Sequence, residues 1–383
     1  MTIECAGVDA LTGRLAALRF GAMIESVEGR EGTRGDLYVA PGFIDLQVNG
    51  FAGVDYNNPA ASLEDIARSI RALFATGVTT FLPTVITGSP DGMAASLRNM
   101  ADAKQKLPEG VAIEGFHVEG PHICPDDGPR GAHPRRWVRK PDIHELRRMQ
   151  EAARGFIRVV TLSPEWPEAP RYIEAAVREG VVVSIGHTNA TAQQIAEAVS
   201  AGATMSTHLG NGSHSVLPRH PNYIWDQLAE DRLCAGLIAD GIHLPAAFLK
   251  TAVRAKGPER RVLVTDAAPP AGAAPGRYKL GEQDVELRPD EHVVLAGTEK
   301  LAGSALRMHI GIGNLVRLAG LSLAEAVAMA TVTPARAARI AGRGAGLRAG
   351  ERGDVVEFRF DTASATIRIE NTYVAGTRVY ARG

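Results

Sequence analysis

Strand-like and helix-like segments alternate through the middle of this chain, and this alternation limits the folds open to it. The strand-like segments are short apolar runs, and a longer amphipathic stretch follows each of them. The eight runs lie at 39–47, 77–84, 113–119, 157–162, 181–187, 203–208, 235–239 and 261–266. Eight such units are what a (β/α)8 barrel requires, whereas six or fewer would favour an open doubly wound sheet. The pattern therefore predicts an α/β fold with a (β/α)8 TIM barrel over residues 41–344.

The two ends of the chain differ from its middle. Residues 1–40 and 345–383 contain short strand-like runs separated by glycine-rich breaks, for example Leu15–Phe20 and Val355–Phe360. We expect both ends to assemble one small β-sandwich domain beside the barrel. Residues 276–300 also have the character of strands and turns, and we expect them to form an excursion after the eighth barrel strand.

Composition excludes several classes of function. The chain has 42 Lys and Arg against 43 Asp and Glu, so its balanced charge predicts no bulk attraction to nucleic acid or to an anionic membrane. Its three cysteines, Cys5, Cys124 and Cys234, are scattered and odd in number, which favours a reducing compartment over a disulfide framework. No apolar run has transmembrane length, and the first residues lack a signal-peptide core. We expect a cytoplasmic protein.

Four of the apolar runs end in a residue that can bind a metal or move a proton: Glu119, His187, His208 and Asp266. In a parallel barrel the carboxyl ends of the strands face one common site. The glutamate and the two histidines offer one oxygen and two nitrogen ligands, a set that suits a borderline divalent metal, zinc first. Three protein ligands leave a position free for activating a water molecule, and Asp266 is suited to take the proton of that water.

Each of these residues also has an ordinary interpretation. A lone buried histidine is more often a hydrogen-bonded core residue, and an aspartate near a strand end is often a helix cap. The occurrence of all four at strand ends favours a single metal-centred site.

Seven motifs carry a resemblance to a known family. They are PGFIDLQVNG (41–50), HVEGPHI (117–123), GHTNAT (186–191), THLGNG (207–212), ADGIHL (239–244), VTDAAPPAG (264–272) and AGSAL (302–306). With these motifs, in this order, the chain resembles the N-acetylglucosamine-6-phosphate deacetylase family of the amidohydrolase superfamily. The resemblance implies a metal-dependent hydrolase that converts N-acetylglucosamine 6-phosphate to glucosamine 6-phosphate and acetate. It assigns Glu119, His187 and His208 as metal ligands and Asp266 as the base and then the acid.

The resemblance also implies residues that face the substrate. His133 matches a histidine near the scissile carbonyl, where an imidazole can polarise the oxygen. Arg219 matches an arginine that meets the sugar phosphate in the neighbouring subunit of a homodimer, and its planar fork suits phosphate. The remaining positions that match substrate contacts are Ala132, Asn211, Gly212, His243, Leu301, Ala302 and Gly303.

The first strand departs from a common amidohydrolase pattern. Many amidohydrolases carry His-x-His there and complete a two-metal site, whereas this chain has Gln47 and Asn49. Neutral amides are poor zinc ligands compared with imidazole or carboxylate. We therefore expect one divalent metal ion, with a second metal held by other groups as the alternative.

The loops that would shape the sugar pocket are the least similar to the family. Residues 120–132 form a slightly longer loop, and residues 210–225 contain two extra histidines, His214 and His220. The sugar epimer and the requirement for a 6-phosphate therefore stay open. The alternatives are an amidohydrolase for another N-acyl substrate, such as an unphosphorylated or epimeric amino sugar or an N-acyl amino acid, and a non-catalytic sugar-phosphate sensor. We expect His122, His214 and His220 to be solvated or capping residues.

Overall fold

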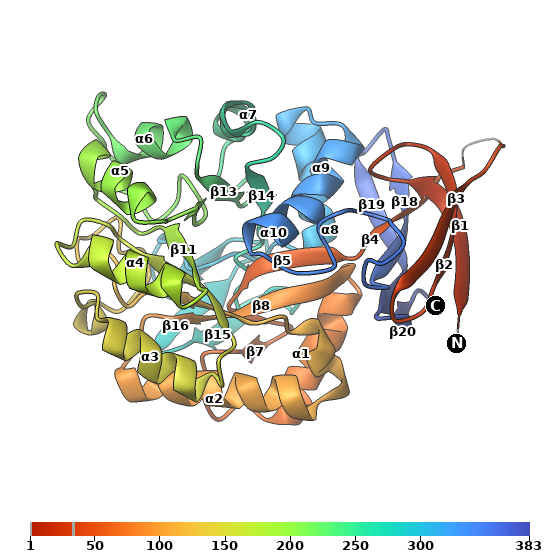
Figure 1. Ribbon diagram of the computed structural model, residues 1–383. Helices are drawn as coiled ribbons and strands as arrows, with labels where there is room; N and C mark the ends of the chain where they lie inside the picture. Colours follow the sequence, from red (N-terminus) through yellow and green to blue (C-terminus); the bar gives the residue numbers. More distant parts are fainter. Residues whose placement is uncertain (1, 33–34) are drawn as a thin grey trace.

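The computed structural model describes residues 2–32 and 35–383, and its larger part is a barrel of parallel strands (Figure 1). Neighbouring barrel strands follow the order of the chain. They are β5 (Phe43–Val48), β8 (Val78–Ile86), β9 (Phe116–Glu119), β10 (Ile157–Leu162), β11 (Val182–Ile185), β12 (Met205–Ser206), β13 (Cys234–Leu237) and β14 (Arg261–Leu263). A parallel bridge between Val48 and Ala267 brings the end of the last strand beside the first, so the barrel is nearly closed. The predicted TIM-barrel fold is confirmed.

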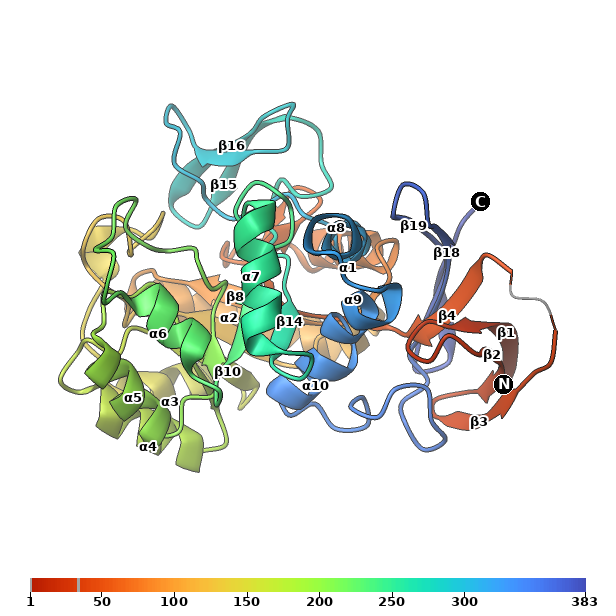
Figure 2. The same cartoon turned by 90° about the horizontal axis from the view of Figure 1, so that it is seen from above.

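Helices cover the outside of the barrel (Figures 1 and 2). They are α1 (Leu63–Phe74), α2 (Pro90–Lys106), α3 (Ile143–Ala152), α4 (Ala169–Arg178), α5 (Ala192–Ser200), α6 (Tyr223–Ala229), α7 (Ala246–Lys256), α8 (Met308–Asn314), α9 (Leu323–Met329) and α10 (Val332–Ala337). Thr191 and Gln194 form a capping box that starts α5. In α1 the buried face includes Ile66, Ile70 and Leu73, at the spacing of an amphipathic helix.

Apolar side chains from strands on different sides of the barrel meet in one buried cluster. Leu46 of β5, Leu82 of β8, Val159 of β10 and Val262 of β14 all belong to it. Because these strands are spread around the barrel, their side chains can meet only in its interior. The interior is therefore a packed core, and a functional site has room only at the ends of the strands.

The expected first strand, 39–47, is divided between two sheets. Val39 and Ala40 belong to β4 (Leu37–Pro41), whereas the barrel strand β5 starts at Phe43. Pro41 has no N–H group with which to continue a ladder. A Cβ atom on Gly42 would lie 2.2 Å from Thr79 Oγ1, so the chain needs glycine at this crossing. The expectation of one continuous strand is wrong here, because an apolar run alone does not show where a chain leaves one sheet for another.

The two ends of the chain build the small domain together. Its sheet has the order β20-β19-β18-β4-β1-β2-β3. The strands not yet given are β1 (Ile3–Asp9), β2 (Leu15–Phe20), β3 (Ile24–Gly29), β18 (Val355–Asp361), β19 (Thr366–Val374) and β20 (Thr377–Ala381). Antiparallel pairing of β4 with β18 joins the N-terminal strands to the C-terminal ones, as the prediction of a small β domain from both termini requires. The domain boundaries at residues 40 and 345 stay a prediction, since β4 crosses the first of them.

The excursion after the barrel strands is a three-stranded antiparallel sheet. It consists of β15 (Gly276–Leu280), β16 (Gln283–Leu287) and β17 (Val293–Leu295). Figure 2 shows that this sheet projects beyond the barrel, separate from the small domain. A two-stranded sheet of β6 (Gly50–Phe51) and β7 (Val54–Asp55) follows β5.

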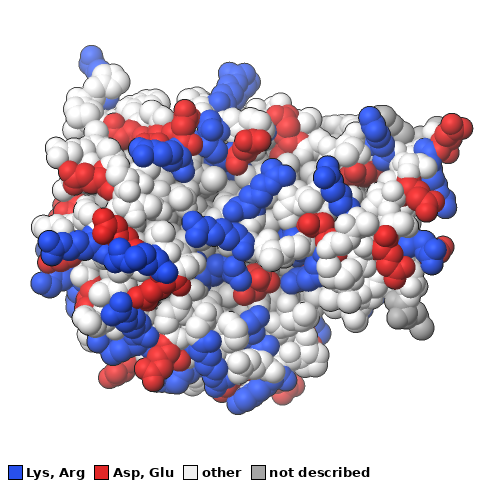
Figure 3. Space-filling view, viewed as in Figure 1, with Lys and Arg blue, Asp and Glu red and all other residues white. Residues whose placement is uncertain are grey.

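The molecular surface agrees with the balanced composition. On the face shown in Figure 3, basic and acidic side chains are interspersed. Among the described residues, none of the helices has both the length and the apolar character needed to cross a membrane.

Candidate functional site

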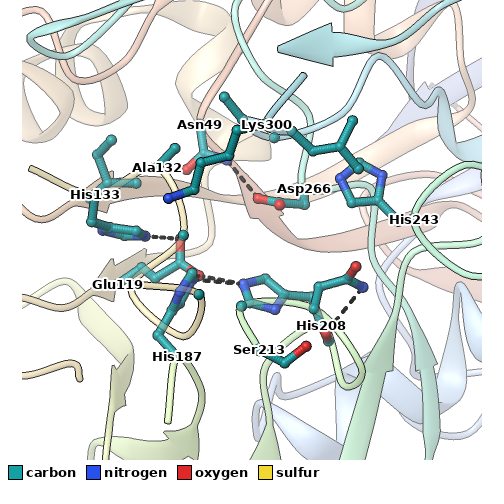
Figure 4. A pocket seen from close by; sticks show the side chains of 18 of the residues that line it. Asn49, Glu119, Ala132, His133, His187, His208, Ser213, His243, Asp266 and Lys300 are labelled. Atoms are coloured by element: carbon teal, nitrogen blue, oxygen red, sulfur yellow. Dashed lines mark hydrogen bonds and ion pairs between the residues drawn. The ribbon is translucent and has the colours of Figure 1, made fainter. Parts of the chain in front are cut away.

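Three of the strand-end residues come together in one buried cluster (Figure 4). Glu119 is the last residue of β9, while His187 and His208 follow β11 and β12 after a single intervening residue. Glu119 Oε1 lies 3.2 Å from His187 Nε2 and 2.8 Å from His208 Nε2. The two Nε2 atoms are 3.0 Å apart. Residues separated by up to 89 positions thus direct their ligand atoms to a single point.

The backbone at the strand ends is strained. His187, His208 and Asp266 have φ angles of 50°, 29° and 51°, in the left-handed region that residues other than glycine rarely occupy. Such conformations persist only where the surrounding structure holds them, and they concentrate at functional sites. Three of the nine described residues other than glycine that have positive φ thus lie at the strand ends of this cluster.

The chemistry of the donor atoms fits a divalent cation. His187 Nδ1 lies 2.7 Å from the carbonyl oxygen of Pro129, and a carbonyl only accepts hydrogen bonds, so Nδ1 carries the ring proton. In the neutral ring, Nε2 then directs a lone pair at the Glu119 carboxylate. A cation between these acceptors removes their repulsion, and a carbonyl that fixes the tautomer of a histidine is a common feature of metal sites.

His133 lies at the edge of the same cluster. Glu119, His133 and His187 each offer an atom within 4.8 Å of the other two, so this set could also hold a metal. However, His133 Nε2 is 4.0 Å from Glu119 Oε2, farther than either His187 or His208 from that carboxylate. The distances favour His208 as the third ligand. Burial and the neighbouring His187 lower the pKa of His133 to about 3, so this imidazole is neutral at physiological pH.

Asp266 is held by the two amides of the first barrel strand. Gln47 Nε2 donates to Asp266 Oδ1 and to Glu119 Oε1, each at 3.0 Å, and Asn49 Nδ2 donates to Asp266 Oδ1 at 2.7 Å. Because carboxylates only accept, the NH2 groups of both amides must face them. The atoms of Gln47 and Asn49 that face the two carboxylates are therefore hydrogen-bond donors, which cannot bind a metal. Burial, followed by the charge of Glu119, raises the pKa of Asp266 to about 6.

A cavity of about 470 Å³ opens above the cluster. Most of the residues expected to face the substrate line it: Ala132, His133, Asn211, Gly212, His243, Leu301, Ala302 and Gly303. Arg219 is exposed on the loop before α6 and is not among the lining residues, so the structure does not bring it to the site of its own chain.

His243 is fixed by a neighbouring carboxylate. Its Nδ1 lies 2.6 Å from Asp240 Oδ2, and the Asp240 carboxylate also accepts the backbone N–H groups of Ile242 and His243. With Nδ1 engaged, Nε2 is the nitrogen of His243 that remains free for a ligand in the cavity.

The three other histidines considered in the sequence lie outside the cluster around Glu119. His122 Nδ1 contacts the carbonyl oxygen of Arg139 at 3.2 Å, and His214 Nδ1 contacts the hydroxyl of Tyr223 at 3.0 Å. His220 is exposed. His214 lines the cavity, and the tyrosine contact engages its Nδ1 atom.

The excursion sheet contributes lining residues that the sequence did not reveal. Leu280, Gln283 and Lys300 belong to it or to the loop that follows it, and all three line the cavity. The only signal for them was the position of Lys300 directly before the expected sugar-contacting residues 301–303. The sequence gives no indication that the excursion folds over the strand ends.

The sequence pattern of the Amidohydrolase family matches residues 38–379. The chain belongs to the amidohydrolase family. This amidohydrolase is 34% identical over 355 residues to N-acetylglucosamine-6-phosphate deacetylase from Bos taurus, covering 90% of this chain and 84% of the relative. It is 35% identical over 319 residues to N-acetylgalactosamine-6-phosphate deacetylase from Escherichia coli O157:H7, covering 83% of this chain and 82% of the relative.

Solved structures agree with this assignment. A mutant of N-acetyl-D-glucosamine-6-phosphate deacetylase from Mycobacterium smegmatis, in complex with N-acetyl-D-glucosamine-6-phosphate, superposes with a TM-score of 0.88. It is 30% identical to this amidohydrolase, and the match covers 100% of this chain and 99% of the other. The resemblance drawn from the seven motifs is confirmed.

Proposed function

We propose that this amidohydrolase removes the acetyl group from an N-acetyl amino sugar 6-phosphate, with N-acetylglucosamine 6-phosphate as the first expected substrate. The products are glucosamine 6-phosphate and acetate. The observation that carries the proposal is the convergence of Glu119, His187 and His208 with Asp266 at the floor of one cavity. The named relatives act on two epimers, which makes N-acetylgalactosamine 6-phosphate the second candidate.

The metal ligands in this proposal are Glu119, His187 and His208. When bound there, a divalent ion, zinc first, would polarise the scissile carbonyl and acidify the attacking water. The amides of Gln47 and Asn49 present hydrogen-bond donors where many family members carry histidine ligands, which supports a single ion.

Asp266 acts as the proton carrier. Its carboxylate accepts the proton of the attacking water and then delivers that proton to the nitrogen of the departing amine. The hydrogen bonds from Gln47 and Asn49 to Oδ1 fix the orientation of the carboxylate, which leaves Oδ2 for this transfer.

His133 acts as a neutral hydrogen-bond donor to the carbonyl oxygen. Its Nδ1 lies 2.8 Å from Thr87 Oγ1. When the Thr87 hydroxyl donates to Nδ1, Nε2 carries the ring proton, and this N–H group can donate a hydrogen bond to the developing oxyanion. His243, held by Asp240, and the backbone around Asn211 and Gly212 then position the sugar.

We further propose a homodimer in which Arg219 reaches the neighbouring active site. Arg219 is exposed and does not line the cavity of its own chain, which supports this arrangement. An arginine in this position could meet a substrate phosphate only in the cavity of another subunit. We place the protein in the cytoplasm, since its free cysteines suit a reducing compartment.

An acetate-release assay tests the proposal. The substrates are N-acetylglucosamine and N-acetylgalactosamine, each with and without the 6-phosphate, together with an N-acyl amino acid, and metal content is measured on the same protein. We expect about one metal ion per chain and the highest kcat/KM on one of the two 6-phosphates. Metal-loaded protein that releases no acetate from any substrate would favour the sensor, and preference for the amino acid would favour another N-acyl hydrolase.

A further inference from the structure

One lysine side chain lines the cavity. Among the described residues that line it, Lys300 is the only lysine or arginine. Figure 4 shows its side chain extending into the pocket. Two carboxylates, Glu119 and Asp266, also line this cavity, so an anionic substrate needs a cation on the opposite side to offset their repulsion.

Lys300 has no partner of its own within the described parts of the chain. Its Nζ makes neither a hydrogen bond nor an ion pair with another described residue, although the side chain is half-buried. The nearby Arg130, in contrast, donates to the carbonyl oxygen of His133 and pairs with Asp127. Partial burial of an unpaired ammonium group is unfavourable, and binding of an anion would compensate for it.

The backbone of Lys300 is tied in place. Its carbonyl accepts from the N–H group of Leu295, the last residue of β17, at 2.8 Å, and its own N–H donates to Thr298 Oγ1 at 3.1 Å. The next residue, Leu301, forms a β-bridge with Val294. The backbone of Lys300 is therefore held by the loop after the excursion sheet, beside the cavity that its side chain lines.

We propose that Lys300 binds the 6-phosphate of the substrate from within the same chain and is a residue that selects phosphorylated sugars. This inference rests on the proposed function and adds to it a phosphate contact that needs no second subunit. Arg219 of a partner would then complete the phosphate contacts and would not be their sole source.

The test compares Lys300→Met with a matched control, Lys279→Met. Lys279 lies in β15 of the same excursion sheet, is exposed, pairs with Asp284 at 2.7 Å and does not line the cavity. For Lys300→Met we expect kcat/KM on the 6-phosphate to fall about 10- to 100-fold, chiefly through a higher KM. Turnover of the unphosphorylated sugar should stay within about twofold of the unmodified protein, since that substrate makes no such contact. Lys300→Arg should restore part of the loss, and Lys279→Met should behave like the unmodified protein.

Equal losses on both sugars, or no loss on either, would overturn the role of Lys300. Failure of the proposed function would have a different signature, because the unmodified protein would then release acetate from none of the sugars. Inorganic phosphate provides a readout that does not depend on turnover. Its calorimetric affinity for the metal-loaded protein should fall by a similar factor in Lys300→Met, and an unchanged affinity contradicts the inference.

Discussion

Asn49 Nδ2 lies 2.7 Å from Asp266 Oδ1, which links the first barrel strand to the end of the last. Gln47 makes a second hydrogen bond to the same oxygen. The two residues that depart from the His-x-His pattern therefore both bind the carboxylate that we propose as the proton carrier. In the proposed mechanism, this amide pair orients Asp266 for proton transfer.

Replacement of the amide pair tests the single-metal arrangement. The double variant Gln47→His, Asn49→His should bind a second divalent ion, because imidazole is a better ligand than a neutral amide. Metal analysis of protein saturated with zinc should give about two ions per chain, against about one for the unmodified protein. A stoichiometry of two in the unmodified protein would contradict the arrangement.

Asn49→Ala tests the orienting role separately. This variant should keep its metal and lose about 10-fold or more in kcat, since Asp266 loses one of its two hydrogen bonds to the first strand. Unchanged kcat at full metal content would show that Gln47 alone holds the carboxylate.

Measuring bound metal in single variants can decide whether His208 or His133 is the third metal ligand. His208→Ala should lose bound metal, because it removes one of the three proposed ligands. His133→Ala should keep metal, since His133 Nε2 lies 4.0 Å from Glu119 Oε2, and should lose turnover because we propose that His133 donates to the substrate carbonyl. Retained metal in His208→Ala together with metal loss in His133→Ala would assign the third ligand to His133.

Much of the site was predictable because its residues stand at the ends of recognisable apolar runs. An apolar run that stops at Glu119, His187, His208 or Asp266 marks both the end of the strand and the residue that faces the site. The fold was predictable for the same reason, because the eight runs are spaced as barrel strands.

The parts of the site that the sequence did not predict depend on contacts between residues far apart in the chain. The role of Gln47 and Asn49 as donors to Asp266 follows from the closure of the barrel, which brings β5 beside the end of β14. Lys300 reaches the cavity only because the excursion folds back over the strand ends. The eight units predict a closed barrel, but neither the side chains that meet across its closure nor the direction of the excursion has a local pattern in the sequence.

The buried carboxyl group of Asp45 should make the stability of the protein depend on pH. Burial raises its pKa to about 7, against hydrogen bonds from Thr265 that lower it. The folded chain therefore keeps a proton that the unfolded chain releases above about pH 4. Between pH 5 and pH 7 this group makes the free energy of unfolding fall as pH rises, by about 2–3 kcal/mol.

Denaturant unfolding of Asp45→Asn isolates this contribution. Because asparagine does not titrate, the free energy of unfolding of the variant relative to the unmodified protein should rise between pH 5 and pH 7. A difference that stays constant over this range would show that Asp45 is ionised in the folded protein.

The proposed role of Arg219 in the neighbouring active site predicts that two defective variants complement each other. Arg219→Ala should raise the KM for the sugar 6-phosphate, and Asp266→Asn should abolish turnover. In a mixed dimer, the Arg219→Ala subunit has an intact Asp266 and receives Arg219 from its partner. Mixing the two variants under subunit exchange should restore a low KM in part of the sites. A KM that stays as high as that of Arg219→Ala alone would contradict the action of Arg219 across subunits, and a normal KM of Arg219→Ala itself would place Arg219 outside the phosphate site.

The most direct test of the proton-carrier assignment uses Asp266→Asn at matched metal content. Acetate release from N-acetylglucosamine 6-phosphate is measured for the zinc-loaded variant and for the unmodified protein, with bound metal determined on the same samples. We expect equal metal and a kcat lower by about 100- to 10,000-fold, because the metal site is intact and the proton carrier is missing. Turnover by the variant close to that of the unmodified protein would contradict the account.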